Sequence, residues 1–110
     1  MEFKVASFYK YIKVKNPMKL MGEIRLLCER LGLKGRVLIG EEGINGVVSE
    51  KIGAVEVFKK QTRQNRSFSN LTFREQDFSR KTYHKLVVSV RDEIVRFVEK
   101  VNLKKNWKTH

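Results

Sequence analysis

The chain has 110 residues, which is enough for one hydrophobic core but too few for two ordinary domains. Lys and Arg contribute 24 residues against 12 Asp and Glu, and the net charge of +12 at pH 7 favours a polyanionic partner such as nucleic acid. An acidic protein partner that balances this charge is the alternative. One Cys excludes an internal disulfide, and the sequence shows no signal peptide or membrane-spanning stretch. We therefore expect a soluble, cytoplasmic domain without a membrane partner.

The first third of the chain predicts a strand followed by a helix. β-Branched and aromatic residues predict the strand over residues 3–12. Asn16 is a suitable N-cap, Pro17 is a suitable first helical residue, and Gly32 marks the end of the helix. Between these signals, apolar residues recur at helical spacing, at Leu20, Ile24, Leu27, Cys28 and Leu31. One stripe of this helix should therefore face the core.

The most distinctive stretch is the run Glu41-Glu42-Gly43-Ile44-Asn45-Gly46, which lies between apolar runs at 37–39 and 47–48. Its glycines and its Asn tolerate the positive φ that a tight hairpin connection requires. We therefore expect a strand, a tight turn within this run, and a second strand. The two adjacent acids should be solvated or paired with nearby Lys and Arg, because neighbouring residues rarely converge as a catalytic dyad does.

The second half of the chain predicts one more helix and two more strands. Ser49 is a suitable N-cap for a helix in which three apolar residues repeat every three positions, namely Ile52, Val55 and Phe58. Strands are predicted over residues 71–73 and 86–90, with a polar connection over 77–82.

The order strand, helix, strand, strand, helix, strand is that of the ferredoxin-like split βαβ fold. We expect an α+β domain over residues 1–97, with two helices on one face of a mostly antiparallel sheet. Residues 94–101 fit a helix, although residues 93–97 fit a last strand equally well. Residues 98–110 form a basic C-terminal tail that is helical or frayed. The predicted core contains Ile24, Leu27, Leu31, Val55 and Phe58.

Several runs resemble the signature of the rhodanese-related tRNA uridine hydroxylases. The first set is Leu31-Gly32-Leu33-Lys34-Gly35, Leu38, the run Glu41-Glu42-Gly43-Ile44-Asn45-Gly46, and Ser49. The second set is Phe8-Tyr9-Lys10-Tyr11, Tyr83-His84-Lys85-Leu86-Val87-Val88, and Glu93-Ile94-Val95. Together these matches cover residues 3–97. The chain departs from the family pattern at Arg96-Phe97-Val98, where the family has Thr-Leu-Gly.

The resemblance implies a ferredoxin-like, acylphosphatase-related N-terminal domain. In that family it precedes a rhodanese domain that holds the catalytic cysteine, and the full enzymes use molecular oxygen to hydroxylate the wobble uridine of certain tRNAs. The chain ends at His110, before any rhodanese domain. We therefore expect a tRNA-binding accessory domain that is not catalytic by itself, with a rhodanese domain supplied in cis or in trans. A protein-interaction or regulatory module is the alternative.

No catalytic residue, metal site or cofactor is predicted for this chain. Cys28 lies on the apolar stripe of the first helix, so we interpret it as structural. His84, expected on a strand, and His110 cannot complete a zinc site with one Cys. Acylphosphatases hold phosphate in a loop with an arginine between the first strand and first helix, but residues 13–17 contain neither Gly nor Arg.

The basic residues predict RNA binding through phosphates rather than through bases. An RNA-recognition module carries aromatic residues on its third strand, and residues 44–49 contain none. Two basic clusters are the predicted RNA-binding residues, namely Lys59, Lys60, Arg63 and Arg66, and Arg80, Lys81, Lys85 and Arg91. A third cluster in the tail is Lys100, Lys104, Lys105 and Lys108. Phe68, Phe78 and Tyr83 are candidates for stacking on a base or for the core.

Overall fold

A computed structural model of the chain describes residues 2–92. Its elements in chain order are β1 (Phe3–Tyr11), α1 (Pro17–Leu31), β2 (Lys34–Gly40), β3 (Gly43–Lys51), α2 (Ile52–Arg63), the short 3-10 helix η1 (Arg66–Phe68), β4 (Arg74–Phe78) and β5 (Leu86–Val90). Neither described helix is long and apolar enough to cross a membrane. The predicted helix or strand after residue 92 lies outside the described residues.

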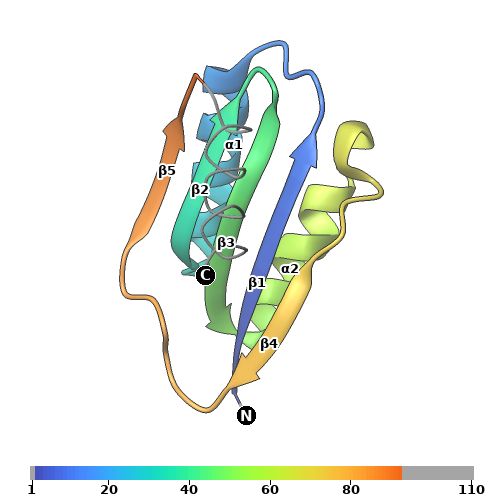
Figure 1. The fold of residues 1–110 in the computed structure, drawn as a ribbon. Helices are drawn as coiled ribbons and strands as arrows, with labels where there is room; N and C mark the ends of the chain where they lie inside the picture. Colours follow the sequence, from blue (N-terminus) through green and yellow to red (C-terminus); the bar gives the residue numbers. More distant parts are fainter. Residues whose placement is uncertain (1, 93–110) are drawn as a thin grey trace, which may run out of the picture.

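The five strands form one sheet in the order β4-β1-β3-β2-β5. β1 pairs antiparallel with β3 and β4, β2 pairs antiparallel with β3, and β5 pairs parallel with β2. Both helices lie behind the sheet in the view of Figure 1, so one face of the sheet carries the helical layer. The predicted ferredoxin-like α+β fold is confirmed.

Helix α1 begins and ends at the predicted signals. The Asn16 side chain accepts a hydrogen bond from the backbone N–H of Lys19, and Pro17 is the first helical residue. Gly32 has φ 72°, and its N–H donates to the last turn of the helix. Local sequence alone therefore determines both ends of this helix.

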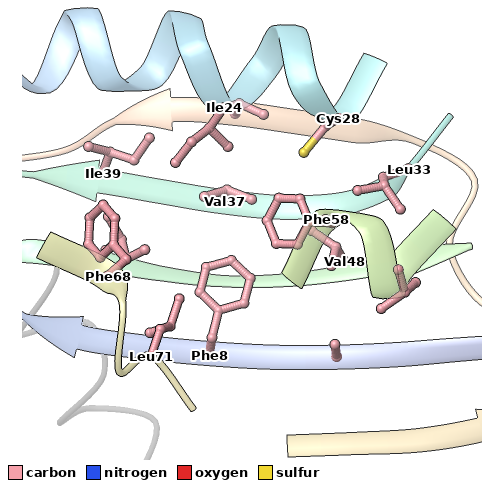
Figure 2. Packing of buried hydrophobic residues seen from close by; sticks show 14 residues of the cluster. Phe8, Ile24, Cys28, Leu33, Val37, Ile39, Val48, Phe58, Phe68 and Leu71 are labelled. Atoms are coloured by element: carbon pink, nitrogen blue, oxygen red, sulfur yellow. The ribbon is translucent and has the colours of Figure 1, made fainter. Parts of the chain in front are cut away.

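The core lies between the helices and the sheet. Ile24 and Cys28 of α1 point toward β2, and Phe58 of α2 packs against Phe8 of β1 (Figure 2). The Phe8 ring centroid lies 5.8 Å from that of Phe58 and 5.3 Å from that of Phe73, distances at which aromatic pairs attract each other. Of the predicted core residues, Ile24, Val55 and Phe58 are buried, while Leu27 and Leu31 are partly buried against the same cluster.

The hairpin between β2 and β3 has its turn within the predicted run, at the head of the motif. Gly40 pairs directly with Gly43, so the turn consists of Glu41 and Glu42 alone, and the remainder of the motif lies in β3. The backbone carbonyls of these two acids accept hydrogen bonds from Val14 and Ile12, each at 2.9 Å. The turn therefore ties down the chain that leaves β1.

The glycines of the motif provide room for close packing. Gly43 has φ 144°, and a Cβ there would overlap the Lys10 carbonyl. A Cβ at Gly46 would lie 2.8 Å from Cζ of Phe8 and 3.0 Å from the backbone oxygen of Arg36. The spacing Gly-x-x-Gly in this run thus meets a steric demand of the sheet.

Ser49 does not cap helix α2, contrary to the prediction. Because β3 continues through Lys51, Ser49 lies within the strand, where it is only 1% exposed. Lys51 takes the N-cap position without a side-chain hydrogen bond, and the N–H of Ile52 donates to the Glu2 carbonyl at 3.0 Å. The chain therefore passes directly from strand to helix.

The strand predicted over residues 71–73 is also wrong, since β4 spans Arg74–Phe78. Leu71 is instead buried, and its N–H donates to the Phe68 carbonyl. β4 pairs only with β1 and its sequence is polar, so hydrophobic periodicity does not reveal it. The polar connection predicted over residues 77–82 spans residues 79–85 instead, and His84, predicted on a strand, lies in this loop. The predicted strand 86–90 is confirmed.

Replacing Gly46 should destabilise the fold, because the new methyl group would collide with the Phe8 ring and with backbone atoms of β2. We expect Gly46→Ala to lower the free energy of unfolding by about 1–3 kcal/mol, measured by urea denaturation. Gly22→Ala is the matched control, since nothing lies within 4 Å of a Cβ there. The control should stabilise helix α1 by up to about 1 kcal/mol. Equal midpoints for both variants would contradict the steric argument.

The Cys28 thiol should resist alkylation in the native protein. It is fully buried, and burial, aided by the charge of Glu29, raises its pKa to about 12. Iodoacetamide at pH 8 should therefore label it slowly in buffer and rapidly in urea, followed by mass spectrometry. An exposed thiol in the variant Cys28→Ser/Ser69→Cys serves as control and should react rapidly in both. Rapid labelling of native Cys28 would show an accessible thiolate.

Candidate nucleic-acid interface

The eight predicted RNA-binding residues lie on three separate parts of the described structure. Lys59, Lys60 and Arg63 belong to α2 and Arg66 to η1. Arg80, Lys81 and Lys85 lie in the loop between β4 and β5, and Arg91 follows β5. Helix α2 and the β4–β5 loop therefore present different basic surfaces.

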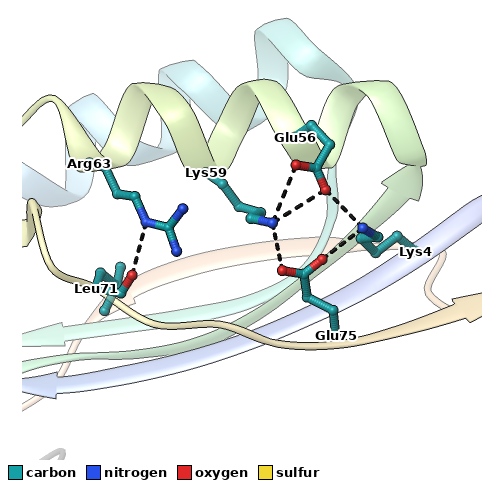
Figure 3. A network of polar contacts seen from close by, with 6 residues as sticks. All are labelled: Lys4, Glu56, Lys59, Arg63, Leu71 and Glu75. Atoms are coloured by element: carbon teal, nitrogen blue, oxygen red, sulfur yellow. Dashed lines mark hydrogen bonds and ion pairs between the residues drawn. The ribbon is translucent and has the colours of Figure 1, made fainter.

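Lys59 belongs to a network of ion pairs inside the domain (Figure 3). Its Nζ lies 2.5 Å from a carboxylate oxygen of Glu75 and 3.3 Å from one of Glu56. Lys4 of β1 contacts the same two carboxylates, at 2.7 Å and 2.8 Å. These four side chains join α2 to β1 and β4, and the Lys59 side chain is only 13% exposed.

The ion pairs lower the pKa of the carboxyl groups and raise the pKa of Lys4. Hydrogen bonds from Lys4 are the main cause that lowers the pKa of Glu56 and of Glu75, and Lys59 adds to both effects. The same hydrogen bonds raise the pKa of Lys4. The two carboxylates are therefore charged at neutral pH, and their contribution to stability is lost when acid protonates them.

Arg63 is also held by the fold. Its Nε donates to the backbone carbonyl of Leu71 at 2.9 Å, and its guanidinium carbon lies 5.0 Å from the centroid of the Phe73 ring. Lys60 and Arg66 are exposed, as Arg63 is, but within residues 2–92 neither forms an ion pair. The first predicted cluster thus divides into two cations, Lys59 and Arg63, that are held by contacts within the domain and two that form no ion pair there.

The second predicted cluster is spread over both ends of β5. Arg80, Lys81 and Lys85 are exposed in the loop before the strand, where Lys81 Nζ lies 3.8 Å from Glu50. Arg91 follows the strand, whose five residues span about 17 Å. The structure therefore does not bring Arg91 together with the other three.

The structure also shows a surface that the sequence reasoning missed, on the face of the sheet opposite the helices. Strand alternation sends Ala6 and Phe8 of β1 into the core, so Tyr9 and Tyr11 lie on the other face. These two rings are 52% and 53% exposed, and their centroids lie 5.6 Å apart. The alternation of Phe8-Tyr9-Lys10-Tyr11 within a predicted strand is the signal that could have revealed this pair.

Asn45 of the distinctive motif belongs to this second face. It pairs with Tyr9 in the register of β1 and β3, and it is half-buried. Its neighbour Ile44 is completely buried on the helical side, and the exposed turn formed by Glu41 and Glu42 lies beyond the end of β1. The motif therefore consists of the turn at Glu41 and Glu42, two glycines that allow close packing, the core residue Ile44, and Asn45 on the face of the sheet opposite the helices.

Residues 2–92 contain no group of three or more His, Cys, Asp and Glu side chains that could hold a metal ion. Cys28, the candidate thiol, is enclosed by the core, so it cannot meet a substrate without unfolding.

Removing a carboxylate from the Lys4 network should make stability less dependent on pH. We expect Glu75→Gln to lower the free energy of unfolding at pH 7 by up to about 1 kcal/mol. The loss should shrink as the pH falls, because wild-type Glu75, whose pKa is lowered, becomes protonated and loses its advantage. Urea denaturation between pH 7 and pH 3 measures this, with Glu23→Gln on the exposed side of α1 as control. A constant difference across this range would contradict an electrostatic role.

Solved structures of other proteins share the fold of this chain. BlrB, a BLUF protein in its dark state, superposes with a TM-score of 0.67 over 93% of this chain and 85% of that chain, at 14% sequence identity. An acylphosphatase from Coxiella burnetii superposes with a TM-score of 0.53 over 82% of this chain and 94% of that chain, at 12% identity. At such low identities the likeness extends to the fold alone.

Comparison of sequences gives a closer relationship. The tRNA uridine(34) hydroxylase of Corynebacterium aurimucosum is 38% identical over 94 residues, which are 86% of this chain and 30% of that protein. The enzyme of the same name from Streptococcus suis is 33% identical over 94 residues, 86% of this chain and 29% of that protein. The chain thus spans less than a third of the length of these relatives. The family model described as the UPF0176 acylphosphatase like domain matches residues 3–94, and the chain belongs to that family.

Proposed function

We propose that this chain is a tRNA-binding accessory domain of an enzyme that hydroxylates the wobble uridine of tRNA, and that it is not catalytic by itself. The observation that carries the proposal is its similarity to tRNA uridine(34) hydroxylases over less than a third of their length. A domain of this size supplies part of such an enzyme, and its net charge of +12 suits a part that holds the polyanionic substrate. The catalytic domain, which we expect to be rhodanese-related, acts in cis or in trans.

Binding of tRNA would draw on counterion release. Each Lys or Arg that neutralises a phosphate releases condensed cations, so affinity falls steeply as salt rises. Lys60 and Arg66 fit this role because they are exposed and lie on or next to a folded helix. Lys59 and Arg63 make internal contacts, so a change of binding in variants of these two would mix folding with recognition. The cytoplasmic location of the protein stays a prediction.

The proposal predicts weak binding of tRNA with a strong dependence on salt. A fluorescence anisotropy titration of labelled tRNA at several salt concentrations measures the slope of log K against log salt. Lys60→Ala/Arg66→Ala should weaken binding and reduce the magnitude of this slope by roughly one for each phosphate contact removed.

The matched control is Lys19→Ala/Arg30→Ala, which removes the same charge from exposed positions on α1, outside the predicted clusters. It should retain most of the slope. Equal losses in both variants would mean that only net charge matters. No binding by wild type even at low salt would exclude the RNA-binding role and would favour the protein-interaction or regulatory module instead.

A further inference from the structure

The face of the sheet opposite the helices, here named the outer face, has a regular arrangement of side chains. The strand registers place Arg74, Ser7, Val47 and Arg36 in one row across β4, β1, β3 and β2. The two arginines lie three strands apart, which is about 14 Å at the usual strand spacing. The next row along β1 contains Tyr9, Asn45 and Leu38; Tyr9 is exposed, Asn45 is half-buried and Leu38 is buried, so the exposed part of this row lies over β1. Two cations therefore lie on either side of small and apolar residues, with an aromatic ring one row away.

The acids of the described strands all lie on one face of the sheet. The acids of these strands, Glu50, Glu75 and Asp77, pair in register with Lys4 or Ala6 and so lie on the helical face. The outer face of the strands carries the cations Lys34, Arg36, Lys51 and Arg74 and, among residues 2–92, no acid. Such a surface attracts an anionic ligand and repels a basic one.

The two tyrosines add a feature that a purely electrostatic surface does not need. Their rings are half exposed on the outer face, although burying aromatic area is among the larger gains available to a fold. Every nucleobase has a flat π-face that stacks on such rings, and this contact requires an unpaired base. The amide of Asn45, beside Tyr9 in register, can donate to and accept from the edge of a stacked base.

We propose that the outer face binds unpaired nucleotides of RNA, with bases stacked on Tyr9 and Tyr11 and phosphates held by Arg36 and Arg74. This inference rests on the proposed tRNA-binding function and adds which structural class of RNA is recognised. A duplex offers phosphates but no free base faces, so it gains only from the cations. The outer face therefore prefers a loop or a single strand over a helix of equal charge.

The test compares two RNA probes, octauridine and an RNA duplex with the same number of phosphates, by fluorescence anisotropy at fixed salt. Wild type should bind octauridine more tightly than the duplex. Tyr9→Leu/Tyr11→Leu keeps apolar bulk but removes the stacking surface, so it should weaken octauridine binding roughly tenfold or more and leave duplex binding unchanged. Tyr9→Phe/Tyr11→Phe keeps the rings and should retain wild-type affinity for both probes.

Two further variants distinguish the contributions of the outer face. Arg36→Ala/Arg74→Ala should weaken the binding of both probes. It should also lower the magnitude of the salt slope for octauridine by about 1.4. Tyr83→Leu, which removes an exposed tyrosine in the β4–β5 loop, is the matched control and should change neither affinity. Urea midpoints near that of wild type confirm that each variant is folded.

The outcomes separate this inference from the function on which it rests. Suppose that Tyr9→Leu/Tyr11→Leu binds octauridine as tightly as wild type, while Lys60→Ala/Arg66→Ala still binds tRNA more weakly than wild type. The stacking surface is then refuted, and the proposed tRNA binding stands. Equal wild-type affinity for octauridine and duplex would likewise refute it. If wild type binds neither probe nor tRNA at low salt, both proposals fail, and the outer face is then a surface for another protein.

Discussion

The packing of the Phe8 ring over Gly46 is the contact on which the rest of the domain depends. Because residue 46 has no side chain, the Phe8 ring of β1 reaches both Phe58 and Phe73, at centroid distances of 5.8 Å and 5.3 Å. Phe58 belongs to α2, and Phe73 immediately precedes β4. The glycine at position 46 of β3 thereby allows the contacts that place helix α2 and the edge strand β4.

The position of α2 in turn decides which cations are available to a ligand. With the helix packed over Phe8 and Phe73, Lys59 reaches Glu75 of β4, and Arg63 reaches the Leu71 carbonyl. On this side Glu75 of β4 and Glu56 of α2 neutralise Lys4 and Lys59. Arg36 and Arg74 lie on the other face of the sheet, and Lys60 and Arg66 stay exposed without an ion pair among residues 2–92.

The relation to acylphosphatase illustrates how a fold can be shared without its site. The chain superposes on the Coxiella burnetii enzyme over 82% of its length. Its loop between β1 and α1 contains Lys13 and Lys15 but neither Gly nor Arg, and Ile12 and Val14 tie it to the carbonyls of the β2–β3 turn. The likeness between the two proteins therefore extends to the fold.

Local signals in the sequence determined much of the architecture. The cap at Asn16, the end at Gly32, the apolar stripes of both helices and the strand 86–90 could all be predicted, because each depends on residues adjacent in the chain or one turn away. The family could be predicted as well, since its motif is contiguous. β4 could not, because its polar residues form a strand only when β1 supplies a partner.

The candidate site depended still more on the tertiary structure. Spacing alone grouped Lys59, Lys60, Arg63 and Arg66, but in the structure Glu56 and Glu75 hold Lys59, and the Leu71 carbonyl and the Phe73 ring hold Arg63. Spacing likewise grouped Arg91 with Arg80, Lys81 and Lys85, but the strand β5 lies between Arg91 and the other three. The row formed by Arg74, Ser7, Val47 and Arg36 comes from four strands, so only their registers could reveal it. The sequence by itself determined what can be read along the chain, and the tertiary structure decided what lies side by side across the sheet, because pairing between distant strands has no local signal.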